Sequence, residues 1–270
     1  MTEFDRYIEV GTEAAVAAGK LLMEKLRTGF AVSYKGDTNL VTEADLASEE
    51  LIVSRIRAAF PGHTILAEEG HPGETDGEYR WIIDPLDGTT NYAHGYPAFS
   101  VSIALEIRGI VEWGIVYNPN LEEQFGARRG SGAFLNGLPV KVSKVNTLND
   151  SLLVTGFPYD VRTNPYNNLD FFAGFMLRSQ AVRRIGSAAL DFCYVAAGRF
   201  DGFWEIELRP WDMAAGVLIA REAGGMVTDI TGAPCSIYQL QCVASNGLIH
   251  EQMLAVLEEV AGLTTSQRGS

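Results

Sequence analysis

The sequence lacks any apolar run long enough to cross a membrane. No stretch of its 270 residues approaches the roughly 20 consecutive apolar residues that a spanning helix needs. The first ten residues, MTEFDRYIEV, also lack the basic start and the apolar centre of a signal peptide. We therefore expect a cytoplasmic protein without a membrane partner.

Cysteine and histidine are scarce as well. The three cysteines, Cys193, Cys235 and Cys242, are an odd number and show no metal-ligand spacing. We expect reduced thiols, with no nucleophile among them. The four histidines do not cluster with cysteine or with one another at any zinc spacing, which argues against a zinc site.

Basic residues are outnumbered by acidic ones. The chain has 21 Lys and Arg against 34 Asp and Glu, for a formal net charge of −13. That balance disfavours binding to nucleic acid through its phosphates, so a nucleic-acid partner is not expected.

The spacing of apolar residues predicts helices at the start of the chain and a strand meander after them. It favours one helix over 3–28 and another from Thr42 to about Phe60. From Ser151 onward, strand and helix patterns alternate, which is typical of an α/β arrangement. The other expected elements are strands at 63–67, 80–84, 98–107, 110–117, 122–127 and 151–156, helix 166–177, strand 181–185, helix 187–198, strand 201–206, helix 212–223, strands 226–230 and 241–245, and helix 247–261.

Nothing in the composition marks a linker between these two parts of the chain. The apolar content of 47% is enough for a sizeable core. We therefore expect a single catalytic unit over 1–262, made of a meander-rich first half (1–145) and an α/β second half (146–262). The polar end, residues 263–270, is expected to be a disordered tail.

The most informative segment is WIIDPLDGTT at 81–90, in which an apolar strand runs into Asp84 and Asp87. Gly88 lets the backbone approach a ligand closely, and a helix that starts at Thr89 would direct unpaired N–H groups at an anion. The alternative is a solvated turn, which is the common reading of a lone Asp-Gly. The apolar residues before the acids disfavour that alternative, because a charge at the edge of a buried strand is costly unless it is paired or bound to metal. Two carboxylates beside an anion site indicate a magnesium-dependent phosphate site.

Two further acidic fragments add to this segment. LAEEG at 66–70 ends a short apolar strand with Glu68 and Glu69, and WDMAAG at 211–216 starts a helix with Asp212. Either fragment alone is weak, because Glu-Glu before Gly is usually a solvated loop and an Asp in a first helical turn is usually a cap or dipole partner.

Together, the three fragments resemble the inositol monophosphatase family of magnesium-dependent, lithium-sensitive sugar phosphatases. The resemblance covers nearly the whole chain and implies an α/β fold built as a five-layer αβαβα sandwich. The segments that carry it are LVTEAD at 40–45, the acidic pair at 68–69, WIIDPLDGTTNYAHGYP at 81–97, GSAALD at 186–191 and FWEIELRPWDMAAGVLIAREAGG at 203–225.

The resemblance implies a site for two or three Mg²⁺ ions, with Mn²⁺ as an alternative ion. The side chains of Glu68, Asp84, Asp87 and Asp212 match the family's metal ligands, and the carbonyl of Leu86 matches its main-chain ligand. Asp84 would bridge two ions, and Glu68 would also count among the catalytic residues. Asp87 and Asp212 would also contact the substrate.

Other residues match the family's water-activating and phosphate-binding groups. Thr89 and Asp45 match the pair that orients and deprotonates the nucleophilic water, so no covalent phosphoenzyme is expected. The backbone N–H groups of Gly88 and Thr89 would hold phosphate oxygens. Lys35 matches a lysine near the mobile metal and the phosphate, although its loop is one residue shorter than in the animal enzymes.

Substrate choice is expected to come from the second half. Glu205 stands seven residues before Asp212, as in the family, where a carboxylate accepts hydrogen bonds from the hydroxyls of a polyol. The main chain of Gly186, Ser187 and Ala188 matches the segment that contacts the sugar. For the Ser187 side chain the alternative is a simple helix cap, and for Glu205 it is an exposed strand residue.

The rim of the pocket is less defined by the sequence. The segment at 156–165 departs from the animal enzymes and leaves the outer rim unassigned. Asp191 and Arg184 are expected to form an internal structural pair. Because the one identifiable charged pocket residue, Glu205, is acidic, a phosphate monoester of a neutral polyol is favoured over a bisphosphate.

These considerations favour hydrolysis of a small phosphate monoester, with inositol 1-phosphate as the leading substrate, by a homodimeric enzyme. Fructose-1,6-bisphosphate or histidinol phosphate is the alternative substrate. A different class of function, a regulatory protein that uses this fold on a macromolecular partner, stays open alone or alongside catalysis. Intact acidic residues argue against pure loss of catalysis, because clustered carboxylates without metal repel one another.

Overall fold

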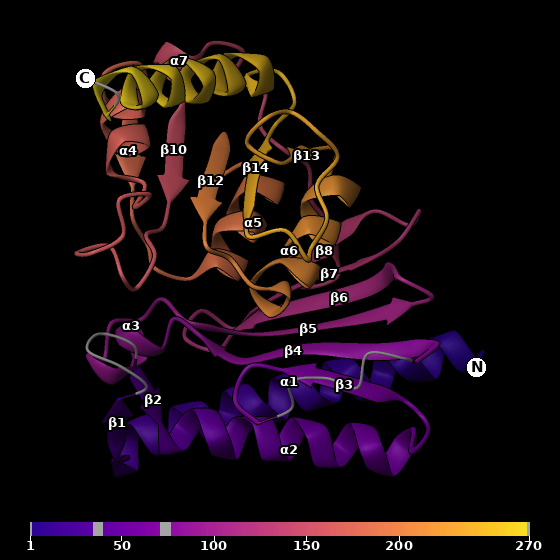
Figure 1. The fold of residues 1–270 in the computed structure, drawn as a ribbon. Helices are drawn as coiled ribbons and strands as arrows, with labels where there is room; N and C mark the ends of the chain where they lie inside the picture. The colour runs from indigo at the N-terminus through magenta and orange to yellow at the C-terminus, as the bar shows by residue number, and fades with distance from the viewer. Residues whose placement is uncertain (1, 35–39, 71–76, 269–270) are drawn as a thin grey trace.

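The protein is built in five layers (Figure 1). Its structure is a computed structural model, which describes residues 2–34, 40–70 and 77–268. The first layer consists of α1 (Glu3–Thr28) and α2 (Glu43–Ala59). Each helix begins at a capping box, in which a threonine (Thr2 or Thr42) and the aspartate three residues later satisfy each other's backbone N–H groups. In the described part of the chain, no helix combines the length and apolar character needed to cross a membrane.

The second layer is a seven-stranded sheet whose strands follow chain order. β3 and β4 pair in parallel, and the other neighbouring strands form an antiparallel meander. Its strands are β3 (Thr64–Ala67), β4 (Tyr79–Asp87), β5 (Ser100–Ile107), β6 (Ile110–Asn118), β7 (Glu123–Arg128), β8 (Ala133–Leu135) and β9 (Leu138–Pro139). Side chains of α1 and α2 share one core cluster with its lower face, where Trp81 and Trp113 are buried.

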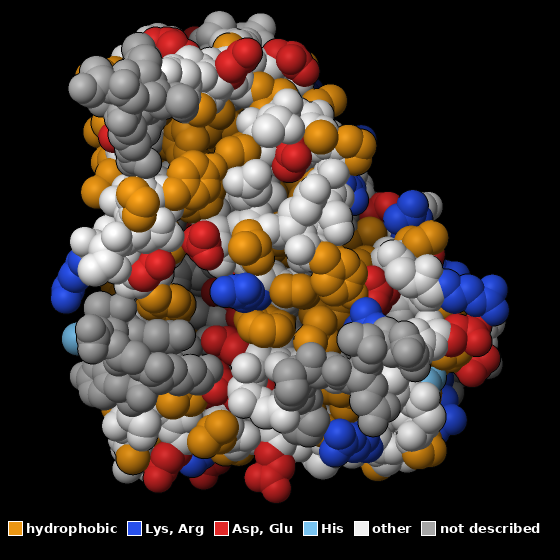
Figure 2. Space-filling model, viewed as in Figure 1, with side chains coloured by type: hydrophobic (Ala, Val, Ile, Leu, Met, Phe, Trp, Pro, Cys, Tyr) orange, Lys and Arg blue, Asp and Glu red, His pale blue; other side chains and the backbone are white. Residues whose placement is uncertain are grey.

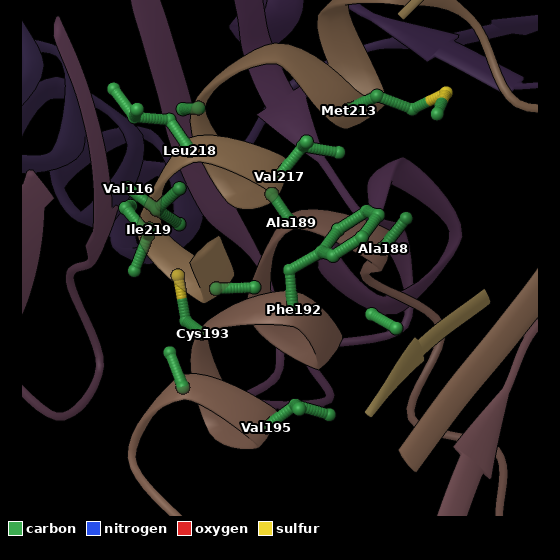
Figure 3. Packing of buried hydrophobic residues seen from close by; sticks show 14 of the residues in the cluster. Val116, Ala188, Ala189, Phe192, Cys193, Val195, Met213, Val217, Leu218 and Ile219 are labelled. Carbon is green, nitrogen blue, oxygen red and sulfur yellow. The ribbon is translucent and has the colours of Figure 1, made fainter. Parts of the chain in front are cut away.

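The third layer contains α5 (Ala188–Ala196) and α6 (Pro210–Glu222), and it lies between the two sheets. Figure 3 shows Phe192 of α5 among side chains of α6 in this core. The two helices approach closely because Gly216 has no side chain: a Cβ there would lie 2.6 Å from Cδ2 of Phe192. The core of this layer therefore covers both sheets at once.

The fourth layer is a mixed five-stranded sheet in the order β11-β10-β12-β14-β13. Its strands are β10 (Leu152–Thr155), β11 (Ala181–Arg183), β12 (Gly202–Ile206), β13 (Met226–Thr228) and β14 (Gln241–Ser245). The fifth layer, α4 (Leu169–Met176) and α7 (His250–Arg268), covers its outer face. Outside the layers lie β1 (Val32–Tyr34), β2 (Leu40–Thr42), the single turn α3 (Thr89–Ala93) and a 3-10 turn, Leu148–Asp150.

The five-layer αβαβα architecture confirms the expected fold class, and several element ends differ from the sequence-based prediction. The last helix begins at His250 rather than 247, because Asn246 caps the N–H groups of Leu248 and Ile249 while Gly247 adopts a positive φ. Its backbone is helical to Arg268, whereas a disordered tail was expected from 263. The short strands β1, β2, β8 and β9 were not expected.

Candidate active site

A cavity of about 460 Å³ opens where the seven-stranded sheet meets the third and fourth layers. Figure 2 shows acidic and basic side chains close together in the middle of this face. The acidic residues that line the cavity are Glu68, Asp84, Asp87, Asp160, Glu205, Glu207 and Asp212. The structure therefore brings together all four side chains predicted to bind metal, from three separate segments: the turn after β3, strand β4 and the start of α6.

Strand β4 delivers two of these acids because its pairing is irregular. Asp84 is paired with Ser102 and Asp87 with Ser100, so β4 has one extra residue between these two pairs. Side chains alternate along a regular strand, and an odd spacing would send the two carboxylates to opposite faces. The bulge, which contains Pro85, lets both side chains line the same cavity.

Asp87 is held by the N-terminus of α5. Its carboxylate accepts hydrogen bonds from the backbone N–H groups of Ala189 (2.9 Å) and Ala188 (3.2 Å), from the Ser187 hydroxyl, and from Ser100 Oγ (3.2 Å). Burial raises the pKa of Asp87, and these donors oppose the rise. Ser187 occupies the N-cap position of α5, but its side chain makes no capping bond, so the cap alternative is wrong for that hydroxyl.

Among the described residues, no ion pair holds Asp84 or Asp212, although the charge of Arg209 lowers the pKa of Asp212. Asp84 is 2% exposed, and burial raises its pKa well above the usual range, with further contributions from Glu68, Asp87 and Asp212. Burial also raises the pKa of Asp212 to about 8, against the hydrogen bond from the backbone N–H of Arg209 (2.6 Å). Without a cation, protons would have to neutralise part of this cluster.

The chemistry of these donors fits a hard divalent cation. Every candidate ligand is an oxygen, including the carbonyl of Leu86 at the cavity wall, and Mg²⁺ prefers oxygen ligands. Within the described residues, no three His, Cys, Asp or Glu side chains already stand close enough to form a metal cage. The cluster therefore offers oxygen ligands and an excess of acidic over basic side chains, in a more open arrangement than a bound ion would require.

Thr89 and Asp45 meet as the resemblance implies. Thr89 Oγ1 lies 2.9 Å from Asp45 Oδ1 and 3.1 Å from the carbonyl oxygen of Leu86. The other carboxylate oxygen of Asp45 accepts hydrogen bonds from the backbone N–H (2.8 Å) and the hydroxyl of Thr42. Burial raises the pKa of Asp45, and the bonds from Thr42 and Thr89 oppose that rise.

Gly88 occupies a position that only glycine fits without strain. Its φ is +96°, and a Cβ would lie 2.9 Å from the carbonyl oxygen of Ala98 and 3.2 Å from that of Gly186. This conformation starts α3 at Thr89 and places both residues at the cavity wall.

The second half supplies the opposite wall of the cavity. Glu205 on β12 lines it beside Gly156, Gly186 and Ala188, and burial together with the charge of Asp87 raises the pKa of Glu205 to about 8. Residues 157–160 also line the cavity, which places the start of the unassigned segment 156–165 at the rim.

Two expectations about charged residues are wrong. Arg184 and Arg209 both line the cavity, so Glu205 is not the only charged residue on the substrate side. Arg184 also forms no hydrogen-bonded pair with Asp191, because both carboxylate oxygens of the buried Asp191 lack a hydrogen-bond partner in the described structure, although the charge of Arg184 lowers the pKa of Asp191. Burial raises the pKa of Asp191 well above its usual range, consistent with a neutral acid. Lys35 lies outside the described residues.

Asn91 does not line the cavity but connects two segments that do, and the sequence analysis missed this role. Its Nδ2 lies 2.7 Å from the carbonyl oxygen of Ala98 and 2.9 Å from that of Ile185, and so links α3 to the turn before α5. The available signal was its place two residues after Thr89, in a turn where a buried amide needs several partners.

The geometry agrees with the relatives of the chain. Residues 3–261 match the family model described as "Inositol monophosphatase family". The chain is 44% identical over 258 residues to "Inositol-1-monophosphatase" of Synechocystis sp., covering 95% of this chain and 90% of the relative. It is 43% identical over 255 residues to "Nus factor SuhB" of Escherichia coli (strain K12), covering 93% and 96%. A solved inositol monophosphatase from Anabaena (Nostoc) sp. PCC 7120 superposes with a TM-score of 0.87 at 45% identity, covering 96% of this chain and 97% of that one.

Proposed function

The chain belongs to the inositol monophosphatase family, and from that premise we propose that it hydrolyses a phosphate monoester of a polyol, with inositol 1-phosphate as the leading substrate. Family membership supports the phosphatase class. The observation that carries the proposal is the convergence of Glu68, Asp84, Asp87 and Asp212 on one cavity, where the other three carboxylates add to the effect of burial in raising the pKa of Asp84.

These acids and the Leu86 carbonyl would hold two or three Mg²⁺ ions, or Mn²⁺ in their place. When bound, such ions neutralise charge on the phosphate and make water a better nucleophile. The protein's part is to fix the acids. The N-terminus of α5 holds Asp87, the backbone N–H of Leu86 donates to Asp84 (3.0 Å), and Arg209 N–H donates to Asp212.

Thr89 and Asp45 would orient the attacking water. Thr89 has one hydroxyl proton, and donating it in a hydrogen bond to Asp45 leaves its oxygen lone pairs to accept a hydrogen bond from a proton of the attacking water. Asp45 thereby helps to remove that proton, and water attacks phosphorus directly, without a phosphoenzyme. The backbone N–H groups of Gly88 and Thr89 would bind phosphate oxygens on the other side.

Glu205 would recognise the alcohol part of the substrate. It faces the cavity across from the acidic cluster, with the main chain of Gly186, Ser187 and Ala188 beside it. A carboxylate accepts hydrogen bonds from two neighbouring ring hydroxyls, which favours a polyol. The family resemblance adds a homodimer and sensitivity to lithium as further expectations.

The proposal is tested by turnover of inositol 1-phosphate with added MgCl₂, with excess chelator, and in the variant Asp84→Asn. We expect hydrolysis that needs Mg²⁺ and falls at least 100-fold in the variant while the unfolding temperature is kept. A variant at the exposed Glu50, Glu50→Gln, is the control. Undiminished turnover in Asp84→Asn would contradict the proposal.

Fructose-1,6-bisphosphate and histidinol phosphate are the alternative candidate substrates. Of these two, the cavity favours the bisphosphate. Arg184 and Arg209 both line the substrate side of the cavity, and a guanidinium binds phosphate well. A rate panel over inositol 1-phosphate, fructose-1,6-bisphosphate and histidinol phosphate separates the three. Lower kcat/KM for inositol 1-phosphate than for the others would replace the leading substrate.

A regulatory role beside catalysis is the other candidate function, since several relatives bear the name "Nus factor SuhB". Catalysis and regulation are separated by Asp84→Asn, which would abolish turnover and leave a surface-dependent role intact. Complementation of a strain that lacks the related protein, with the wild-type chain and with this variant, is the measurement.

A further inference from the structure

One face of α2 presents polar side chains to three separate segments of the candidate active site. Asp45, Ser48 and Glu49 lie at helical spacings of three and four residues, so they share that face. All three are buried, with 0%, 0% and 3% exposure. Burying polar groups on a helix is costly unless each finds a hydrogen-bond partner.

Glu49 binds the turn that carries Glu68. Its carboxylate oxygens accept hydrogen bonds from the backbone N–H groups of Glu69 (2.8 Å) and Gly70 (2.9 Å). These are the two peptide groups that directly follow Glu68, one residue after the end of β3. A two-point attachment here limits where the Glu68 side chain can enter the cavity.

Ser48 binds the bulge of β4. A serine inside a helix usually donates to a carbonyl of its own preceding turn, but Ser48 Oγ donates to the carbonyl oxygen of Pro85 (2.8 Å). Pro85 stands between Asp84 and Leu86. With Asp45 bonded to Thr89, the same helical face therefore reaches segments 68–70, 84–87 and Thr89.

We infer that Ser48 and Glu49 are positioning residues, which set the distance between the Glu68 turn and the Asp84–Asp87 bulge so that one set of divalent cations can bridge them. This inference rests on the proposed function. A helix suits the task because its backbone is rigid and the spacing of its side chains is fixed. The two residues act through the ligands, since neither lines the cavity.

The experiment compares Glu49→Gln with Glu50→Gln, a matched change at an exposed glutamate of the same helix. Calorimetric titration with MnCl₂ gives the affinity, and amide hydrogen exchange at Glu69 and Gly70 reports the attachment. We expect at least tenfold weaker binding in Glu49→Gln, as for other residues that orient metal ligands, with faster exchange at both amides. Glu50→Gln should match the wild type.

A double-mutant cycle separates positioning from general stability. In a Glu68→Gln background, adding Glu49→Gln should cost less than twofold in affinity, because the ligand through which it acts is gone. An equal loss in both backgrounds would overturn the inference. Ser48→Ala removes only a hydroxyl and serves as a second variant in case Glu49→Gln fails to fold. It should weaken Mn²⁺ binding at an unchanged unfolding temperature, and unchanged Mn²⁺ binding would again overturn the inference. A wild-type chain that takes up no Mn²⁺ would instead refute the proposed function.

Discussion

The carboxylate of Asp87 accepts a 2.9 Å hydrogen bond from the backbone N–H of Ala189, 102 residues further along the chain. Three further donors converge on the same carboxylate, among them the hydroxyl of Ser187. The bulge of β4 and the first turn of α5 thus form one unit. A helix N-terminus favours a negative charge, so α5 opposes the rise that burial causes in the pKa of this candidate metal ligand.

Removing the Ser187 hydroxyl should weaken that unit. Ser187→Ala removes one of the four donors to Asp87. A hydrogen bond to a charged group contributes about 1.5 kcal/mol, so its loss should lower kcat/KM roughly tenfold. The Mg²⁺ concentration for half-maximal rate should rise as well. Steady-state rates over a MgCl₂ series measure both effects, and Ser54→Ala at an exposed position is the control. Equal kinetics in the two variants would contradict this role for Ser187.

Gly88 should tolerate no side chain. Gly88→Ala combines an unfavourable positive φ with an approach of 2.9 Å to the Ala98 carbonyl oxygen, and we expect about 1–3 kcal/mol of lost stability together with loss of turnover. Thermal unfolding and rate assays measure this. Gly62→Ala is the control, because its φ is not positive and a Cβ there meets no atom within 4 Å. Similar unfolding temperatures for the two variants would refute the argument.

Stability without metal should fall as the pH rises. Glu205 has a folded-state pKa of about 8, against 4.5 as its ordinary value. An acid with a raised pKa keeps its proton in the folded state and loses it when unfolded, so between about pH 4.5 and 8 a rise in pH favours unfolding. Thermal unfolding in chelator at pH 5, 7 and 9 should show this loss. The unfolding temperature of Glu205→Gln should fall less than that of the wild type over the same pH interval. An equal fall in both proteins would contradict the prediction.

The contact between α5 and α6 should be intolerant of added volume. Gly216→Ala places a methyl group 2.6 Å from Cδ2 of Phe192 and should cost about 1–3 kcal/mol of unfolding free energy. Phe192→Leu in the same chain should recover part of that loss, because the smaller side chain makes room. Denaturant unfolding measures both. Gly262→Ala on α7, where a Cβ would meet open space, should be neutral or stabilising.

The arginines of the cavity should affect substrates with a second phosphate selectively. Arg184→Ala is expected to lower kcat/KM for fructose-1,6-bisphosphate by tenfold or more and to change that for inositol 1-phosphate less than threefold, because only the former has a second phosphate. The ratio of the two rates is the measurement. Arg183→Ala, at the exposed neighbouring position on β11, is the control. A proportional fall on both substrates would show that Arg184 acts on the site as a whole.

Much of the fold was readable from local patterns. Strand β14 was predicted at 241–245 with both ends correct, since its apolar run is bounded by polar and glycine residues. The strands that were missed, such as β1 and β8, are three residues long, and so short a run has no distinct periodicity. They exist because neighbouring strands supply the hydrogen bonds.

The candidate site was predictable where acids follow strands and helix starts, and not where its shape depends on distant partners. The sequence marks Ser187 as the start of a helix, but its partner Asp87 is 100 residues away. Likewise, of two consecutive arginines, Arg184 lines the cavity while Arg183 ends β11. Which of them faces the substrate depends on the turn to Gly186 rather than on residue type.

The helices of the third layer make the two halves of the chain depend on each other for stability. Each of α5 and α6 begins beside the acids and continues between the two sheets, burying one face of both. Residues 1–145 alone would expose to water the face of their sheet that α5 and α6 cover in the full chain. The remaining residues alone would expose the apolar side chains of these two helices. Separating the two halves near residue 146 would thus expose apolar surface on both pieces and disperse the acidic residues of the cavity, which come from both of them.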